Sequence, residues 1–444
     1  MPPKAKEAPA SSEPNAVQTQ SVCVVGLGYV GLPIATVLAA SGLSVFGVDV
    51  DPRVRGALVA GEPNAAEEGL AELLKRALAE GRLAAGERPK PADAFIIAVP
   101  TPLYEDDGKS ADLSHVEGAA RAVSAVVRPG NLVILESTVP PGTTEQLLVP
   151  QLERSGLKAG RDLLVAHVPE RVLPGNLIAE LTQNARVIGG IDRRSAEAAR
   201  DLYARFVEGG LILTDARTAE MVKLMENTYR DVNVALANEF AVLAEDLGVD
   251  VWRALDIANQ HPRVNIHRPG PGVGGHCVPV DPWFLASASS YPAPLIRAAR
   301  AVNDAMPERI AAALRSELAA VERPVVALLG LAYKGNTDDT RNSPALALAR
   351  QLSDWQVRAH DPRVRAVAEV ETFDSAEEAA RGADALVLMT DHREFADLDP
   401  NALRTAMRGR FVYDTRGLLD AAAWRAAGFD IRRLGAPAAP PTRD

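Results

Sequence analysis

The sequence predicts an α/β protein in which two doubly wound, Rossmann-like domains are joined by a long central helix. Three observations indicate this fold class. A strand, a glycine-rich turn, a helix and a second strand follow one another in VCVVGLGYVGLPIATVLAASGLSVFGVDVDP (22–52). The strand pattern returns near the carboxyl end, where VRAHDPRV (357–364) echoes GVDVDPRV (47–54). Between these regions, apolar residues recur at helical spacing over 218–248.

The composition limits the partners that the chain could bind. Its 444 residues are enough for two or three domains. The net charge of −10 gives no electrostatic reason to bind nucleic acid or an anionic membrane, so we expect neither. No apolar run approaches the roughly 18 residues of a membrane span. Residues 1–20 are rich in Pro, Ala, Ser and Gln and are expected to form a disordered tail.

The chain has only two cysteines, Cys23 and Cys277, which lie far apart in different contexts. No disulfide framework is expected, and a reducing compartment, the cytoplasm, is the natural location. Cys23 lies in an apolar run and is expected to be a buried core residue.

The glycine-rich turn predicts a dinucleotide site. Gly26 permits the tight turn, Gly28 lets the backbone approach a pyrophosphate, and Gly31 lets helix and strand pack closely. Asp49 ends the second strand, where a carboxylate accepts hydrogen bonds from the adenosine ribose and repels a 2′-phosphate. We therefore expect NAD rather than NADP as the cofactor.

Two further strands extend this unit. AFIIAVPTP (94–102) and LVILESTVPPGTT (132–144) each lead into Thr and Pro. Cofactors lie along the carboxyl edge of open α/β sheets, so Thr101 and Thr138 are expected at the cofactor.

The segment TAEMVKLMENTYRDVNVALANEFAVLAEDLG (218–248) is expected to form one long helix that ends at Gly248. A helix of this length exceeds what one small domain needs, so we expect it to join the two units and to contribute to a dimer interface. Lys223 and Asn227 are four residues apart and share one face.

The segment GPGVGGHCVPVDP (270–282) places Cys277 on a rigid, glycine-rich loop rather than in a strand or helix. For His276 we expect an ordinary loop histidine that is bonded to the backbone. A zinc site is not expected, because no other thiol and no ligand pair of suitable spacing accompanies these residues.

The carboxyl-terminal unit repeats the strand-and-turn pattern in PVVALLGLAYKG (324–335) and ALVLMTDH (385–392). It lacks the glycine triplet and offers Lys334, Arg341 and Arg416 instead. These residues suit the phosphates of a nucleotide better than a second dinucleotide, although their spacing alone also fits a solvated surface.

Six blocks of the chain resemble, in this order, the nucleotide-sugar 6-dehydrogenases of the UDP-glucose/GDP-mannose dehydrogenase type. They are GLGYVGLP, ESTVPPGTT, PERVLPG, KLMENTYRDVNVALANEFA, PRVNIHRPGPGVGGHCVPVDPWF and GLAYKGNTDDTRNSPA. The resemblance covers about residues 21 to 435. It implies a NAD-binding domain over 21–212, a central dimerisation domain carrying the cysteine loop over 213–320, and a UDP-binding domain over 321–437.

The resemblance also implies a four-electron oxidation of C6 of a UDP-sugar, from primary alcohol to carboxylate, with two NAD reduced. Cys277 stands at the position of the family's nucleophile, which forms a thiohemiacetal and then a thioester. Lys223 matches the residue that stabilises thiolate and oxyanions, with Asn227 as a second donor. Glu170 and Asp281 match the acidic groups that handle water and protons, and Glu170 is the stronger candidate for thioester hydrolysis.

The remaining site residues are carried over in the same way. Arg263 is expected to reach the neighbouring subunit's site in a homodimer. The implied cofactor-binding residues are Gly26, Gly28, Tyr29, Val30, Gly31, Asp49, Arg53, Thr101, Thr138 and Arg341. The implied substrate-binding residues are Arg171, Val172, Leu173, Lys223, Asn227, Arg263, His267, Gly270, Gly274, Tyr333, Lys334 and Arg416.

The choice of substrate rests on differences between branches of the family. Val280 occupies a position where UDP-glucose dehydrogenases tend to have lysine. Val172, Leu173 and His267 differ from what UDP-N-acetylglucosamine enzymes tend to show. We therefore expect UDP-N-acetyl-D-mannosamine, with UDP-N-acetylglucosamine and UDP-glucose as alternatives.

Two hypotheses of other classes compete with this one. A hydroxyacid-type dehydrogenase would share the first domain and the long helix, but it needs neither the cysteine nor a second α/β unit. A non-catalytic NAD-binding scaffold would tolerate loss of the reactive residues, yet Lys223, Asn227, Cys277, Asp281 and Glu170 are all present.

Overall fold

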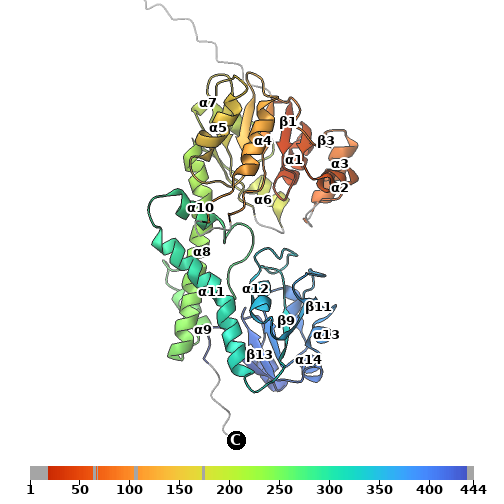
Figure 1. The fold of residues 1–444 in the computed structure, drawn as a ribbon, viewed down its shortest axis with the longest axis vertical. Helices are drawn as coiled ribbons and strands as arrows, with labels where there is room; N and C mark the ends of the chain where they lie inside the picture. The colour runs from red at the N-terminus through yellow and green to blue at the C-terminus, as the bar shows by residue number, and fades with distance from the viewer. Residues whose placement is uncertain (1–18, 64–66, 68, 105–108, 173–175, 438–444) are drawn as a thin grey trace, which may run out of the picture. The chain divides into compact units, whose positions relative to one another are not determined.

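The computed structural model describes residues 19–63, 67, 69–104, 109–172 and 176–437 (Figure 1). They form two compact units. The first comprises the chain up to Thr101 and from Leu113 to Glu220, and the second comprises Pro102–Asp112 and the chain from Met221 onward. At the amino end, Thr19 is buried and the backbone N–H of Gln20 donates to the Asp93 carboxylate at 2.9 Å, so these two residues belong to the packed part.

The first unit is built on one sheet, whose order over the described residues is β3-β2-β1-β4-β5-β6-β7-β8. The strands pair in parallel except at β6 and β7, which are antiparallel. This order reverses direction between β1 and β4, as in a doubly wound fold. The strands are β1 (Ser21–Val25), β2 (Ser44–Val48), β3 (Leu83–Gly86), β4 (Ala94–Ile97), β5 (Leu132–Leu135), β6 (Leu164–His167), β7 (Arg186–Gly190) and β8 (Leu211–Asp215).

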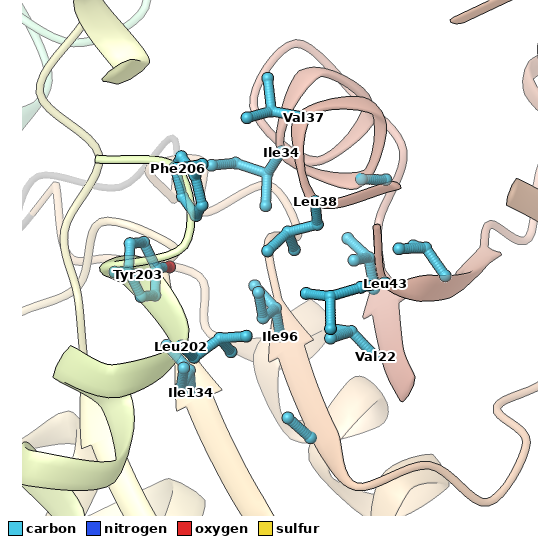
Figure 2. Packing of buried hydrophobic residues seen from close by; sticks show 14 of the residues in the cluster. Val22, Ile34, Val37, Leu38, Leu43, Ile96, Ile134, Leu202, Tyr203 and Phe206 are labelled. Carbon is cyan, nitrogen blue, oxygen red and sulfur yellow. The ribbon is translucent and has the colours of Figure 1, made fainter. Parts of the chain in front are cut away.

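Helices cover both faces of this sheet, because alternate residues of each central strand are apolar and point to opposite sides. In β1, Val22 and Val24 face one core, and Cys23 and Val25 face the other. Figure 2 shows the first core, where Ile34 and Leu38 approach Ile96. The helices of this unit are α1 (Gly31–Ala40), α2 (Pro52–Ala60), α3 (Leu70–Ala79), α4 (Ser114–Ser124), the π-helix η1 (Thr144–Leu148), α5 (Val149–Glu153), α6 (Leu177–Gln183) and α7 (Arg193–Tyr203).

The second unit contains an all-parallel sheet of order β11-β10-β9-β12-β13-β14, again over the described residues. Its strands are β9 (Val325–Leu329), β10 (Gln356–His360), β11 (Glu371–Thr372), β12 (Ala385–Leu388), β13 (Phe411–Asp414) and β14 (Asp430–Arg433). The helices that follow these strands are α12 (Pro344–Gln351), α13 (Ala376–Ala380), the 3₁₀ helix η2 (Arg393–Asp397), α14 (Pro400–Ala406) and α15 (Ala421–Ala426).

Long helices complete the second unit. The predicted central helix runs as α8 (Ala216–Leu247), 32 residues. Its carboxyl half packs with α9 (Val251–Ala258) and α11 (Pro294–Glu317) in one core with the second sheet. The glycine-rich segment around Cys277 leads into the short helix α10 (Asp281–Ala288). The predicted fold class, two Rossmann-like domains joined by a long helix, is therefore confirmed.

Within the described residues, no helix combines the length and the apolar character that crossing a membrane requires.

Candidate active site

The glycine-rich turn follows β1 and has the local geometry of a dinucleotide site. Gly26 has φ +92°, a left-handed conformation that favours glycine. A Cβ added at Gly31 would lie 1.8 Å from the carbonyl oxygen of Gly26, so only glycine fits there. A Cβ added at Gly28 would meet no atom within 4 Å, so this position leaves room for a ligand beside the backbone. The turn therefore fits a pyrophosphate.

The residues around this turn fix its shape. Asp49 directly follows β2, and its carboxylate accepts hydrogen bonds from the backbone N–H groups of Leu27 and Asp51, both at 2.9 Å. Tyr29 donates to Glu67 at 2.7 Å, and Val30 precedes α1 and packs against the core. Arg53 is exposed and pairs with the neighbouring Asp51.

Two threonines meet at the carboxyl edge of the first sheet. The hydroxyl of Thr101, after β4, donates to the carbonyl of Thr138, after β5, at 2.8 Å. Ser137 links the same two segments, because its hydroxyl accepts from the N–H of Val99 at 2.9 Å. The ends of β4 and β5 are thus held together where an open α/β sheet binds its ligand.

Glu170 follows β6 and is 8% exposed. Its carboxylate accepts a hydrogen bond from the backbone N–H of Val172, whose side chain packs against the first core. Arg171 donates to the carbonyl of Ala185 at 3.0 Å. Leu173 lies outside the described residues.

A second carboxylate lies near Glu170. Glu136, at the end of β5, is buried with the guanidinium of Arg186, 3.9 Å away. Burial raises the pKa of Glu136 to about 8, Arg186 opposes this effect, and Glu170 adds to it. No local pattern predicted this pair, because Glu136 follows β5 and Arg186 begins β7, far apart in the chain.

In the second unit, α8 and α10 bring three of the predicted catalytic side chains together. Lys223 and Asn227 lie one turn apart on α8 and are 6% and 1% exposed. The amide of Asn227 donates to the carboxylate of Asp281, the first residue of α10. Arg230 in turn donates to the oxygen of Asn227. Burial raises the pKa of Asp281 to about 6, while Lys223 and Asn227 oppose the rise.

Cys277 lies four residues before the first residue of this helix. Its carbonyl accepts hydrogen bonds from the N–H groups of Val280 at 3.0 Å and Asp281 at 2.8 Å, so a tight turn joins the cysteine to Asp281. The thiol is free and partly exposed, whereas Cys23 is free and fully buried. A reactive thiol needs such access.

The glycines before Cys277 let this loop contact the loop that follows β9. A Cβ at Gly274 would lie 2.6 Å from Cβ of Tyr333, and one at Gly275 would lie 3.0 Å from its ring. Gly275 is also held at both backbone groups. Its N–H donates to the carbonyl of Arg341 at 2.8 Å, and its carbonyl accepts from Asn342 at 2.9 Å.

Arg341 and His276 share one carboxylate, that of Asp339. The Arg341 guanidinium lies 2.6 Å from Asp339, and Nδ1 of His276 lies 3.7 Å from it. The imidazole of His276 thus faces a carboxylate, a contact that the expectation of a loop histidine bonded to the backbone did not include. The sequence reasoning passed over Asp339, although it stands two residues before Arg341.

The other predicted residues are spread around the second unit. Gly270 is held by its N–H, which donates to Asn238 at 2.8 Å, and a Cβ there would lie 2.6 Å from the guanidinium of Arg416. Arg416 pairs with Asp391 at 2.8 Å. The residues Lys334 and Arg263 are exposed, and His267 is partly buried.

Among the residues that the structure describes, no three His, Cys, Asp or Glu side chains are grouped so that they could hold a metal ion.

Comparison with known proteins gives three consecutive family matches. The NAD-binding, central and UDP-binding domains of the UDP-glucose/GDP-mannose dehydrogenase family match residues 20–207, 217–305 and 327–421. The UDP-N-acetyl-D-mannosamine dehydrogenase of Methanocaldococcus jannaschii is 44% identical over 93% of this chain and 96% of its own. An NDP-N-acetyl-D-galactosaminuronic acid dehydrogenase of Ralstonia solanacearum is 44% identical over 91% and 97%. The structure of the UDP-N-acetyl-D-mannosamine dehydrogenase of Pyrococcus horikoshii matches with a TM-score of 0.89 and 45% identity, covering 94% of this chain and all of that one.

Proposed function

The chain belongs to the UDP-glucose/GDP-mannose dehydrogenase family, and from this premise we propose that it oxidises C6 of UDP-N-acetyl-D-mannosamine to the carboxylate. It is a NAD-dependent oxidoreductase, as the sequence predicted. The mannosamine substrate is supported by relatives of that name, at 43–45% identity over more than nine tenths of this chain. The three domain assignments drawn from the sequence, over 21–212, 213–320 and 321–437, are part of the proposal.

The arrangement around Cys277 carries the mechanism. A partly exposed thiol stands one turn before a buried carboxylate, Asp281, which Asn227 holds. Lys223 lies one helical turn from Asn227 on the same face of α8. A lysine and an amide in a buried setting stabilise developing oxyanions strongly, because water does not compete for them.

Each residue has a role in the proposed reaction. Bound NAD would supply the hydride acceptor, with one NAD reduced for each of the two hydrides that leave C6. Lys223 and Asn227 stabilise the oxygen on C6 as it gains negative charge. Cys277 forms a bond to the aldehyde carbon, giving first a thiohemiacetal and later a thioester, so the reactive aldehyde cannot escape. Glu170 takes a proton from the water that cleaves the thioester.

The atoms balance over the whole reaction. One alcohol and one water give one carboxylate, two hydrides and three protons. Asp281 accepts one of these protons in its ionised form, since burial raises the pKa of its carboxyl to about 6.

Two residue sets are proposed to hold the ligands. Gly26, Gly28 and Gly31 would hold the pyrophosphate of NAD and Asp49 its ribose, with the remaining cofactor residues Tyr29, Val30, Arg53, Thr101, Thr138 and Arg341. The diphosphate and sugar of the substrate would contact the backbone at Gly270 and Gly274, together with Arg171, Val172, Leu173, Arg263, His267, Tyr333, Lys334 and Arg416.

We also propose a homodimer in the cytoplasm. A stripe of exposed apolar side chains follows one side of α8, comprising Met221, Met225, Tyr229, Leu236 and Leu243, which are 39–59% exposed. A contiguous apolar stripe of this kind is typical of an interface between subunits. Arg263 is exposed and free to reach a neighbouring subunit. The reducing compartment follows from the two free cysteines.

A substrate panel tests this function. The purified protein is incubated with NAD and with the UDP-linked forms of N-acetylmannosamine, N-acetylglucosamine, N-acetylgalactosamine and glucose, and both NADH and the sugar acid are measured. We expect the highest kcat/KM for the mannosamine sugar and two NADH for each sugar acid. The galactosamine arm is included because of the Ralstonia relative. One NADH per sugar, or retained acid formation in Cys277→Ser, would contradict the thioester route.

A further inference from the structure

His276 and Cys277 are neighbours in the chain, and a carboxylate from a distant loop faces the histidine. Nδ1 of His276 lies 3.7 Å from Oδ2 of Asp339. The imidazole also interacts with the thiol of Cys277. Thiol, imidazole and carboxylate are thus in successive contact within the second unit.

Asp339 is fixed independently of the histidine. Nη2 and Nε of Arg341 lie 2.6 and 2.9 Å from its two carboxylate oxygens, and the backbone N–H of Arg341 donates to Oδ1 at 3.0 Å. The N–H of Tyr333 donates to the Asp339 carbonyl at 2.9 Å. The carboxylate is therefore already in place when it meets the imidazole.

The histidine is fixed by the glycine that precedes it. The N–H of Gly275 bonds to Arg341 and its carbonyl to Asn342. Its φ of +92° favours glycine, and a Cβ there would lie 3.0 Å from the ring of Tyr333. Residues 275–277 and the loop 333–342 therefore form one rigid contact. A surface histidine would not need such support.

We propose that His276, held by Asp339, is a positioning residue that keeps the sulfur of Cys277 as a thiolate before the substrate arrives. The S–H bond of Cys277 breaks and an N–H bond forms on the imidazole, which leaves an imidazolium between thiolate and carboxylate. When the thioester is hydrolysed, the sulfur leaves as a thiolate beside the same imidazolium, so the ion pair is restored for the next turnover. This inference rests on the proposed role of Cys277 as the nucleophile, and it adds the group that ionises it.

Several other charged groups face this pair. From α8, Lys223 and Arg230 face Asp281 of α10, and Arg230 also interacts with Tyr333. From the loop 333–342, Tyr333 interacts with Cys277, Asp339 interacts with His276, and Arg341 interacts with both. The Asp281 carboxylate also interacts with His276. Arg341 is paired with Asp339, and Lys223 interacts electrostatically with Asp281, so each of these cations has an anionic neighbour other than the thiol. Compared with Arg341 and Lys223, the imidazolium of His276 is the cation that directly precedes Cys277 in the chain.

The electrostatics agree with this arrangement. Burial lowers the pKa of His276, but Asp339 and Cys277 outweigh burial and bring it to about 9. Burial opposes the ionisation of Asp339, yet His276 and Arg341 hold its pKa well below the usual range. Burial raises the pKa of Tyr333 to about 12, so its hydroxyl stays neutral. His276 is then cationic at neutral pH, and an adjacent cation favours a thiolate.

The pH dependence of thiol alkylation in the free enzyme tests the proposal. Iodoacetamide reacts with the thiolate, so the rate at Cys277, followed by peptide mass spectrometry, reports its ionisation. Cys23 does not interfere, because it is fully buried and burial raises its pKa to about 11. We expect the wild-type midpoint well below the usual value of about 8.5. His276→Asn should raise it by about 1 to 2 pH units, which slows alkylation at neutral pH by about 5- to 50-fold for a wild-type midpoint near 7.

Two variants separate charge from structure. His276→Lys restores a cation without an imidazole, so its midpoint should return toward that of the wild type. His115→Asn, an exposed histidine on α4, should leave the profile unchanged. A His276→Asn profile that coincides with the wild type would overturn the proposal. If His276→Asn does not fold, as judged by tryptophan fluorescence, a His276→Lys midpoint far above the wild-type value would overturn it instead.

The role of Asp339 has its own measurement. In Asp339→Asn, the His276 ring should titrate at lower pH than in the wild type, as seen in its Cε1 proton resonance. An unchanged ring titration would remove Asp339 from the proposal. Neither experiment requires turnover, so failure of the proposed function would show as missing sugar acid while the alkylation and ring titrations still decide the role of His276.

Discussion

The long helix α8 is tied to α11 by a buried ion pair, and removing one partner should destabilise the second unit strongly. Arg300 on α11 pairs with Asp231 on α8, and the two side chains are 2% and 0% exposed. Asn303 donates to the same carboxylate at 2.8 Å, and its side-chain oxygen accepts from the amide of Asn238 at 2.9 Å. The side-chain oxygen of Asn238 in turn accepts from the N–H of Gly270. The Arg300→Met variant keeps the length of the side chain and leaves the Asp231 carboxylate buried without its cation.

The expected magnitude follows from burial. Breaking a buried pair by removing one partner costs about 3 to 5 kcal/mol. Arg315, on the same helix, pairs with Asp354 at 2.6 Å, but the two side chains are 41% and 59% exposed. The matched variant Arg315→Met should cost about 1 kcal/mol or less. With a urea slope of roughly 2 to 3 kcal/mol per M, Arg300→Met should lower the unfolding midpoint by about 1 to 2.5 M.

Tryptophan fluorescence is the right measurement, because all four tryptophans of the chain lie at or beyond residue 252, in the second unit. Urea unfolding followed in this way reports on that unit alone. The double variant Asp231→Leu/Arg300→Met removes both charges and should recover most of the loss. Equal midpoint shifts in Arg300→Met and Arg315→Met would refute the reasoning, since burial would then not determine the cost.

Three further predictions concern the two proposed ligand sites and the first core. Gly28→Ala should weaken NAD binding, measured by titration calorimetry, without changing the midpoint of thermal unfolding. Gly31→Ala should lower that midpoint, because its Cβ would lie 1.8 Å from a backbone oxygen. The reverse pattern would contradict the roles given to these glycines. Burial raises the pKa of Asp281 to about 6, so kcat/KM should rise with pH through about 6 as the carboxylate forms, and Asp281→Asn should lose this limb of the profile. Burial raises the pKa of Glu136 to about 8, so the carboxyl is largely protonated at pH 7. Glu136→Gln, which resembles the neutral acid, should therefore not lower the free energy of unfolding at pH 7, as measured by circular dichroism in urea; a loss of about 3 kcal/mol would show instead that the pair with Arg186 is ionised.

Local sequence signals were sufficient for the fold. The helix expected over 218–248 runs over Ala216–Leu247, because apolar spacing and a following glycine mark a helix without any tertiary information. The glycine triplet and Asp49 likewise mark the end of a strand, a turn and the next strand, all within one short segment. Each of these features depends on residues that are close in the chain.

The contacts that hold the candidate site could not be predicted in the same way. His276 and Asp339 meet because a backbone hydrogen bond between Gly275 and Arg341 holds their two loops together. No pattern in the residues around His276 indicates that Asp339 is its partner. The pair of Glu136 and Arg186 could not be predicted for the same reason. Glu136 follows β5 and Arg186 begins β7, so the contact depends on how the strands are arranged in the sheet. Spacing predicts which residues share a helix face or a strand, but not which loop faces which.

The two Rossmann-like sheets also show why the same turn can bind a dinucleotide in one place and not in the other. Gly26 and Gly330 both have φ +92°, and the N–H of each donates at 2.8 Å to the last residue of the neighbouring strand, Val48 or His360. By this register Asp361 takes the place of Asp49, although the repeated letters DPRV would align it with Asp51.

The difference lies in what each turn leaves open. The first turn has Gly28 with free space, and in the second turn the same position is the buried Ala332. Asp49 accepts one N–H from its turn, whereas Asp361 accepts two, from Leu331 and Ala332, and is also 3.0 Å from His392. The methyl group of Ala332 occupies the space that a pyrophosphate would need. The Asp361 carboxylate already accepts hydrogen bonds within the unit, so it is not available to a ribose. The turn after β9 therefore has the same backbone geometry as the turn after β1, but protein atoms occupy the positions where a dinucleotide would bind. A nucleotide bound to the second unit must then contact other residues of that unit.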